Sequence, residues 1–228
     1  MRLRLTQEGL KRRIITALVV IVAFSTALAQ PLDSTGSFRR GSDRYYKNGA
    51  LKQCKLVKVM NLQGYPCQGD VWFHDNGSLK EFQLAESTAV QGIGFPARTW
   101  ICLNDDGTLN YVFLPRMMII QGVPCAGSRM GREGIMTAFH PNSNLRACYL
   151  AFPAVIRNVP LRAGAFSPVE LYDDGSLKSG WLSGPYEADG LVYGARMRLV
   201  FSPEGQVIET HRRFWLSQVW TDLLDAIF

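Results

Sequence analysis

Few residues of this chain could do acid–base or metal chemistry, and two histidines stand out because they share a position. His74 and His140 each lie three residues before the central residue of a repeated turn motif. Imidazole nitrogens bind metals, so these residues are candidate ligand-binding side chains. They lie two copies of the motif apart, and strands are spaced by about 4.8 Å, so one metal ion could join them only in a closed ring. The same position in the other copies indicates a solvent-facing series: Tyr46, Asn104, Tyr172 and Ser202.

Carboxylates gather in the same turns, with adjacent pairs at Asp105-Asp106 and Asp173-Asp174. Such a pair could bind Ca²⁺ weakly, or act as acid and base in a secreted hydrolase. Turns favour Asp for its local hydrogen bonds in any case. The sequence contains no Gly-x-Ser-x-Gly, HExxH, CxxC or phosphate-loop motif. We therefore assign no catalytic residue, metal or cofactor and expect a non-enzymatic protein, with the hydrolase as an alternative.

Five cysteines form a third group that could do chemistry. Cys54 and Cys148 share one position of the repeat, and Cys67 and Cys125 share another; Cys102 is the fifth. Equivalent residues of a linear array are separated by whole copies, beyond the reach of about 7 Å between Cα atoms that a disulfide allows. Either a bridge joins non-equivalent positions, or the thiols are small buried apolar side chains.

These residues are positioned by a motif that recurs along the chain. It consists of an aromatic or aliphatic residue, a short polar turn that ends in Gly, and then Leu or Val. With the Gly as position 0, the six copies are centred at residues 49, 77, 107, 143 (a Ser), 175 and 205. A period of this size indicates tandem supersecondary units. Positions −4 and +2 are apolar in every copy, and the change of alternation around the Gly predicts a β-hairpin with a bulge beside a left-handed Gly.

A third element follows each hairpin. Position +15 is Gly or Asn in five copies, and a Pro follows it closely in four of them. Gly or Asn at one site predicts a positive φ angle, and the Pro excludes a central-strand hydrogen bond. We therefore expect a short strand or corner that redirects the chain toward the next hairpin.

The predicted fold is all-β. Six antiparallel hairpin copies over residues 44–208 would bury their apolar faces against one another, as an extended or curved sheet, a solenoid or a closed ring. Residues 209–228 carry apolar side chains at spacings of 3, 4 and 7 and predict an amphipathic α-helix. The helix would cap the end of the array, or alternatively contact a partner or a membrane surface.

Residues 1–29 are typical of a secretory signal peptide. A basic segment precedes an apolar run, Ile14 to Leu28, which ends in Ala27-Leu28-Ala29 with Gln30 next. The run is shorter than the roughly 20 residues that span a bilayer. We expect cleavage near Ala29-Gln30, a flexible segment over 30–43, and a periplasmic or extracellular protein. The leader holds most of the formal charge of +6, so we expect no nucleic-acid partner. Membrane association would arise only through an uncleaved leader or the C-terminal helix.

The turn segments Tyr45–Lys52 and Leu171–Leu182 resemble two groups of repeats in exported bacterial proteins. These are the choline-binding or cell-wall-binding hairpin repeats and the MORN-like repeats of YwqK-type proteins. The resemblance covers only the hairpin of each copy. It implies an architecture of stacked hairpins, in which an aromatic residue after the hairpin lines a ligand site. That position, +6, holds Trp181 in the fifth copy and Lys55, Gln83, Phe113 and Tyr149 in the others, so we assign no choline site.

The repeated Gly, Asp or Asn and Leu are explained by hairpin geometry, so a binding site is expected where the copies differ. The variable places are positions −3 and +6 and the Gly-rich loop at 126–136. The candidate ligand-binding residues are Trp181, Tyr172, Tyr149, His74 and His140. We predict an exported binding or scaffold module of the bacterial cell envelope, whose partner is an envelope protein or, alternatively, a cell-wall glycan.

Overall fold

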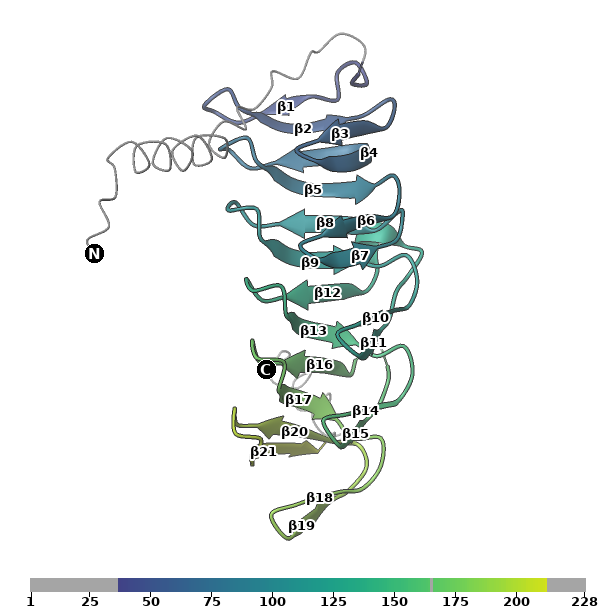
Figure 1. The fold of residues 1–228 in the computed structure, drawn as a ribbon, viewed down its shortest axis with the longest axis vertical. Coiled ribbons are helices and arrows are strands. Elements are labelled where there is room, and N and C mark those ends of the chain that lie inside the picture. The colour runs from purple at the N-terminus through teal and green to yellow at the C-terminus, as the bar shows by residue number, and fades with distance from the viewer. Residues whose placement is uncertain (1–36, 165, 213–228) are drawn as a thin grey trace, which may run out of the picture. The chain divides into compact units, whose positions relative to one another are not determined.

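A computed structural model describes residues 37–164 and 166–212, and in them the chain is all-β (Figure 1). A 13-stranded antiparallel sheet, the main sheet, runs in the order β1-β2-β4-β5-β8-β9-β12-β13-β16-β17-β20-β21, with β3 paired to β4. Its first and last strands do not pair with each other, so the sheet is open and not a closed ring. Its strands are β1 (Arg44–Tyr45), β2 (Leu51–Lys55), β3 (Met60–Leu62), β4 (Tyr65–Phe73), β5 (Leu79–Leu84), β8 (Trp100–Leu103), β9 (Leu109–Phe113), β12 (Met136–Phe139), β13 (Leu145–Tyr149), β16 (Pro168–Leu171), β17 (Leu177–Trp181), β20 (Met197–Phe201) and β21 (Val207–Arg212).

The repeated Gly closes each main-sheet hairpin in the predicted way. In the second copy the Gly77 amide donates to the His74 carbonyl, the His74 amide donates to the Ser78 carbonyl, and Gly77 has a φ of 84°. The strand register shifts beside this turn, as it does in all six copies. Asn76 accepts the Ser78 amide with its side-chain oxygen. The predicted bulge beside a left-handed residue is therefore confirmed.

The third element is a second, smaller hairpin, so the prediction of a single short strand or corner is wrong. The four separate small hairpins are β6–β7 (Thr88–Val90 and Ile93–Phe95), β10–β11 (Met118–Ile120 and Val123–Cys125), β14–β15 (Ala154–Ile156 and Val159–Leu161) and β18–β19 (Tyr186–Ala188 and Leu191–Tyr193). In the first copy the pair β3–β4 takes this role. Two residues connect the strands and both have positive φ, as at Gln91 (49°) and Gly92 (81°), which a type I′ turn requires. The expected positive φ at position +15 is confirmed.

The small hairpins pack against one face of the main sheet and make a two-layer core. Phe95 of β7 meets Phe139 of β12 edge to face at 6.2 Å, and Leu161 of β15 lies over Gly180 of β17. A Cβ atom at Gly180 would stand 2.7 Å from a Leu161 methyl group, so the missing side chain makes room for Leu161. Leu161 belongs to the fourth copy and Gly180 to the fifth, so this small hairpin covers the main hairpin of the next copy. Phe95 of the second copy reaches the main hairpin of the fourth, and the core is continuous along the array.

The C-terminal prediction needs a correction at its start. Glu209 to Arg212 form the end of β21, where Glu209 pairs with Val200 and His211 pairs with Arg198. The prediction of a helix from residue 209 is therefore wrong over 209–212, because these residues alternate between two faces of a paired strand. The rest of that prediction, 213–228, lies outside the described residues.

The N-terminal predictions are only partly covered by the structure. The signal peptide at 1–29 and residues 30–36 of the expected flexible segment lie outside the described residues. The segment from residue 37 lies against the first hairpin, where Phe38 bridges Leu56 and the Arg39 amide donates to the Lys55 carbonyl. In the described parts of the chain, no helix is long and apolar enough to cross a membrane.

Candidate functional site

The turn end of the main sheet contains three of the five candidate residues, and there they connect neighbouring copies. The Nε2 of His74 lies 3.1 Å from the Leu103 carbonyl oxygen, and the Nε2 of His140 lies 3.0 Å from that of Leu171. The Tyr172 hydroxyl donates to the Phe201 carbonyl at 2.8 Å. Each acceptor is the −4 residue of the next copy. Because a carbonyl oxygen can only accept, Nε2 is the protonated nitrogen in both histidines.

Position −3 is therefore not a solvent-facing series, and that prediction is wrong. Its side chains are half-buried, and four of the six bond to the backbone of the following copy; Tyr46 donates to the Phe73 carbonyl. The open sheet keeps His74 and His140 two copies apart. Among residues 37–164 and 166–212, no three His, Cys, Asp or Glu side chains gather to hold a metal ion. These contacts give His74, His140 and Tyr172 a structural role.

The second face of the main sheet is the one opposite the small hairpins. Residues at −7 and +6 of the copies form one line across it, as the cross-strand partners show: Trp100 with Phe113, Phe113 with Met136, and Tyr149 with Pro168. Six consecutive strands, β8 to β17, each contribute one aromatic or apolar side chain to this line. We call this set the aromatic row: Trp100, Phe113, Met136, Tyr149, Pro168 and Trp181.

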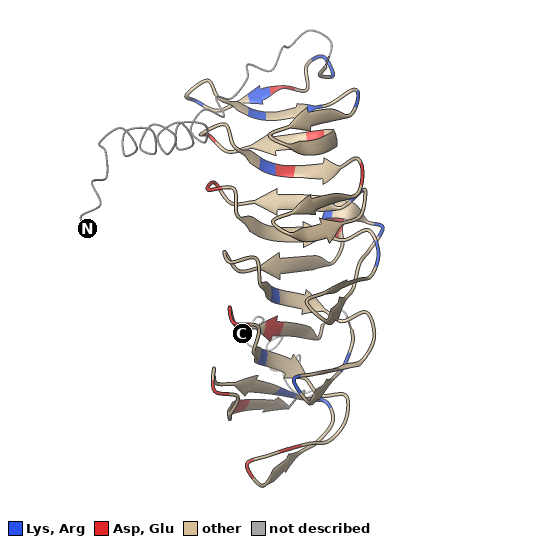
Figure 2. Ribbon diagram, in the orientation of Figure 1, with Lys and Arg blue, Asp and Glu red and all other residues tan. Residues whose placement is uncertain are grey.

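The aromatic row is partly accessible and carries little charge. Met136 is 43% exposed, and Phe113, Tyr149 and Trp181 are half-buried. Strands β8, β9 and β12 contain no charged residue (Figure 2). Neighbouring strands are about 4.8 Å apart, so the +6 side chains of successive copies recur about every 10 Å. The structure thus brings Tyr149 and Trp181 onto one face, two strands apart.

Charged groups lie next to the aromatic row at the Trp181 end. The Ser179 hydroxyl donates to Glu170 at 3.0 Å and accepts from Arg198 at 2.9 Å, and Arg198 also pairs with Glu170 at 3.6 Å. Arg198 is the cross-strand partner of Trp181. An aromatic platform is therefore bordered by groups that can donate and accept hydrogen bonds.

The Gly-rich loop contributes to the same face at the other end of the row. It contains the 3₁₀-helix η2 (Gly131–Glu133). The Arg132 guanidinium lies 4.1 Å from the ring centre of Trp72 and 5.6 Å from that of Trp100, and it donates to Glu81 at 2.9 Å. Arg132 thus stacks on indole rings at the start of the row, and the segment from Phe113 to Trp181 lies beyond these contacts. The sequence predicts a variable site in this loop, and the structure links the loop to the face that carries position +6.

Trp100 and Phe113 belong to the row but were missing from the predicted site. Phe113 shares position +6 with Tyr149 and Trp181, so the repeat alignment contained the signal. Trp100 stands at −7, directly across from Phe113. Trp100 would have been found if the alternating pattern of the first strand of each copy had been followed back to position −7.

The five cysteines are all buried free thiols. Burial raises the pKa of Cys54 from the ordinary thiol value of 9.0 to about 11 and that of Cys67 to about 12. The interaction of Cys125 with the side chain of Cys148, together with burial, raises the pKa of Cys125. Their contact joins position +18 of one copy to +5 of the next, which is a non-equivalent pair. Of the two alternatives given by the sequence, the structure therefore agrees with the second, in which the thiols are small buried side chains.

The Cys54 and Cys67 thiols predict a loss of stability at alkaline pH. Because their pKa is higher in the folded chain, the stability they contribute is complete below pH 9.0 and is lost as the pH rises toward 11 to 12. We expect the ultraviolet absorbance of thiolate to rise at higher pH in the folded protein than in urea. Titration of Cys54 and Cys67 at the ordinary value in the folded protein would contradict this placement.

A comparison of the chain with models of known protein families, with curated proteins and with solved structures found no match to it.

Proposed function

We propose that this chain is an exported, non-enzymatic β-repeat protein that binds an extended glycan of the bacterial cell envelope along its aromatic row. The observation that carries the proposal is the line of six aromatic or apolar side chains on six consecutive strands. Aromatic rings offer flat apolar faces, and the faces of sugar rings carry C–H groups that pack on them. A repeat of about 10 Å along an open sheet suits a polymer better than a small molecule.

The polar border of the row supports the same ligand class. A glycan presents hydroxyl groups at the edges of its rings, and these need hydrogen-bond partners when the ring faces are covered. Arg198 and Glu170, which the buried Ser179 hydroxyl connects, are partly exposed near Trp181 and supply a donor and an acceptor. The leader at 1–29 and the resemblance to cell-wall-binding repeats support an envelope location.

The environment of the turn carboxylates favours binding over hydrolysis. Asp106 accepts the Thr108 hydroxyl at 2.6 Å and its amide at 2.8 Å. These two hydrogen bonds lower the pKa of Asp106, and the interaction of Asp174 with Ser176, whose amide it accepts at 2.7 Å, lowers that of Asp174. A general acid must hold a proton near neutral pH, which these groups do not.

The test is binding of the mature protein to purified, insoluble cell wall by co-sedimentation. Tyr149→Ala and Trp181→Ala are each expected to weaken binding about tenfold, since each removes one stacking platform. Phe152→Ala is the matched control, because Phe152 is 49% exposed but lies on the connection after β13, outside the row. Circular dichroism checks that each variant is folded.

Three outcomes would contradict the proposal. Unchanged retention of both row variants would exclude the aromatic row as the binding surface. Release of soluble sugar fragments by the wild-type protein would favour the hydrolase alternative. Retention that depends on protease-sensitive material in the wall would point to an envelope protein as the partner.

A further inference from the structure

The small-hairpin turns hold the next copy through a glutamine at position +14, which we call the glutamine clamp. Gln63 donates to the Gly77 carbonyl at 2.9 Å and accepts the Leu79 amide at 3.0 Å. Gln91 makes the same two bonds to Gly107 and Leu109, at 2.8 and 3.0 Å. Gln121, which belongs to the third copy, makes the same two bonds to Ser143 and Leu145 of the fourth copy. Each glutamine side chain thus satisfies one backbone donor and one backbone acceptor of a bulged turn.

In the fourth copy the clamp residue is Arg157, and an arginine cannot replace a carboxamide there. A guanidinium has donors but no acceptor, so it cannot accept the amide of Leu177, the residue equivalent to Leu79. Within the described residues no side chain accepts that amide. The Arg157 Nη2 atom stands 3.8 Å from the position that a Cβ atom of Gly175 would occupy, so the guanidinium still lies over the turn.

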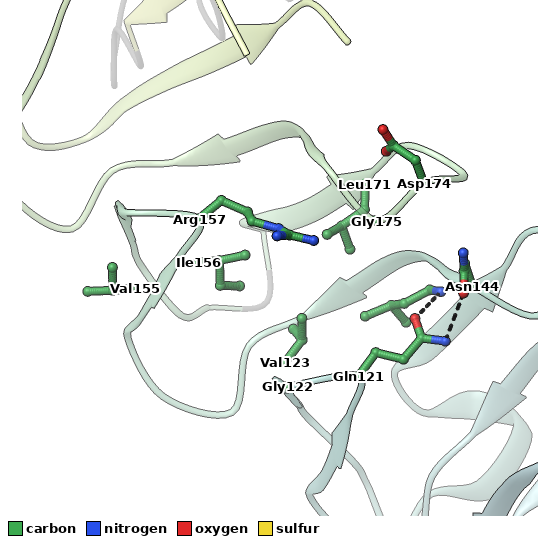
Figure 3. A pocket seen from close by; sticks show the side chains of 11 residues that line it. Gln121, Gly122, Val123, Asn144, Val155, Ile156, Arg157, Leu171, Asp174 and Gly175 are labelled. Carbon is green, nitrogen blue, oxygen red and sulfur yellow. Dashed lines mark hydrogen bonds between the residues drawn. The ribbon is translucent and has the colours of Figure 1, made fainter. Parts of the chain in front are cut away.

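A cavity of about 390 Å³ opens at this place, between the small hairpins β10–β11 and β14–β15 and the turns of the fourth and fifth copies (Figure 3). This volume is within the usual range for small-ligand sites. Figure 3 shows Arg157 extending toward Gly175. The apolar part of the lining comes from Val123, Val155, Ile156 and Leu171.

The other polar side chains of the cavity already have partners. Asp174 accepts the Ser176 amide at 2.7 Å. Gln121 donates to Ser143 and Asn144, and Asn144 donates to the Asp173 carbonyl at 2.7 Å. Arg157 makes no ion pair within 4.0 Å in the described residues. The pKa of Asp174 is lowered by its interaction with Ser176 and also by the charge of Arg157, so the cavity contains both a cation and a carboxylate. It also has an apolar wall, and the Leu177 amide, without its clamp, lies two residues after the lining residue Gly175.

We propose that this cavity binds a carboxylate attached to a short apolar group, as at the C-terminus of a peptide that ends in alanine. One carboxylate oxygen accepts the Leu177 amide, in the place that a glutamine oxygen takes at the second, third and fourth copies, and the charge pairs with Arg157. The apolar group packs on Val155 and Ile156. The site lies at the turn end of the sheet and does not depend on the glycan surface.

The test is a titration of ¹⁵N-labelled protein followed by the amide resonance of Leu177. N-acetyl-L-alanine is expected to shift this resonance to saturation, and the neutral N-acetyl-L-alaninamide to bind at least tenfold more weakly. This pair of probes needs no variant, so a folding defect cannot obscure the result. An unshifted Leu177 amide, or equal binding of both probes, would overturn the proposal.

Arg157→Gln provides the structural counterpart. It is expected to restore the glutamine clamp, raise the melting temperature and abolish the response to N-acetyl-L-alanine. Arg146→Gln removes the same charge from an exposed position of β13 and is expected to change neither property. Retained binding in Arg157→Gln would overturn the assignment of the guanidinium to the ligand.

Discussion

Replacing Arg132 by alanine is expected to lower the free energy of unfolding by about 3 kcal/mol, because it leaves a buried carboxylate without its partner. The Glu81 side chain is 8% exposed, and its two oxygens are met by Nε and Nη2 of Arg132. The same guanidinium stacks on Trp72 at 4.1 Å. Removing it exposes that ring and releases the loop that contains η2. Urea denaturation measures the loss.

A double-mutant cycle separates the ion pair from the packing of the loop. Glu81→Gln removes the charge and keeps the shape, so Arg132→Ala is expected to cost clearly less in the Glu81→Gln background than in the wild type. Arg129→Ala, in the same loop and outside the ion pair, serves as the control. An Arg132→Ala variant as stable as the wild type would show that the loop does not stabilise the sheet.

Replacing Gln121 by alanine is expected to cost about 2 kcal/mol, since it leaves a buried amide without its acceptor. Gln121 accepts the Leu145 amide at 2.8 Å and donates to the Ser143 carbonyl at 3.1 Å. Leu145 is 2% exposed, so any water that replaces the lost acceptor must enter from the adjoining cavity. Alanine and glutamine bear the same backbone strain at a φ of 49°. The difference in stability between the variant and the wild type therefore measures the contribution of the clamp.

Gln121→Glu gives a directional check of the same clamp. A carboxylate can still accept the Leu145 amide but cannot donate to Ser143, and it repels that carbonyl oxygen. Its stability is therefore expected to improve at acid pH, where the protonated acid can donate. Gln206→Ala changes an exposed glutamine in the last turn and is expected to have no effect. A Gln121→Ala protein with wild-type stability would contradict the role of the clamp.

The main hairpins were predictable from the sequence because each is specified locally. The Gly, the Asp or Asn before it and the alternating apolar residues suffice to predict the turn, the bulge and the buried face. The small hairpin was missed because only half of its turn has a recognisable residue. Gly64, Gly92 and Gly122 indicate one positive φ, but the preceding glutamine adopts a second one, which local preference does not favour. The hydrogen bonds from the glutamine to the next copy compensate for that strain, and they form only when the copies have stacked on one another.

The same difference between local patterns and contacts with the next copy explains which site residues could be placed from the sequence. Tyr149 and Trp181 lie on one face because position +6 alternates with the buried +5 and +7 residues, and this alternation is visible in the sequence. His74, His140 and Tyr172 were assigned to solvent because their acceptors are carbonyl oxygens about 30 residues later in the chain. No local pattern shows such a partner. The substitution of Arg157 for glutamine is visible in the sequence, but its meaning requires the three clamps in the other copies.

The open sheet gives this architecture a property that a closed ring would lack. Each duplication of one copy adds two strands to the main sheet and lengthens it by about 10 Å. The small hairpin of the copy before covers the new core, and the turn-end hydrogen bonds need no redesign. Recombination between copies can therefore adjust the reach of the aromatic face in discrete steps, while the fold of every unit stays the same.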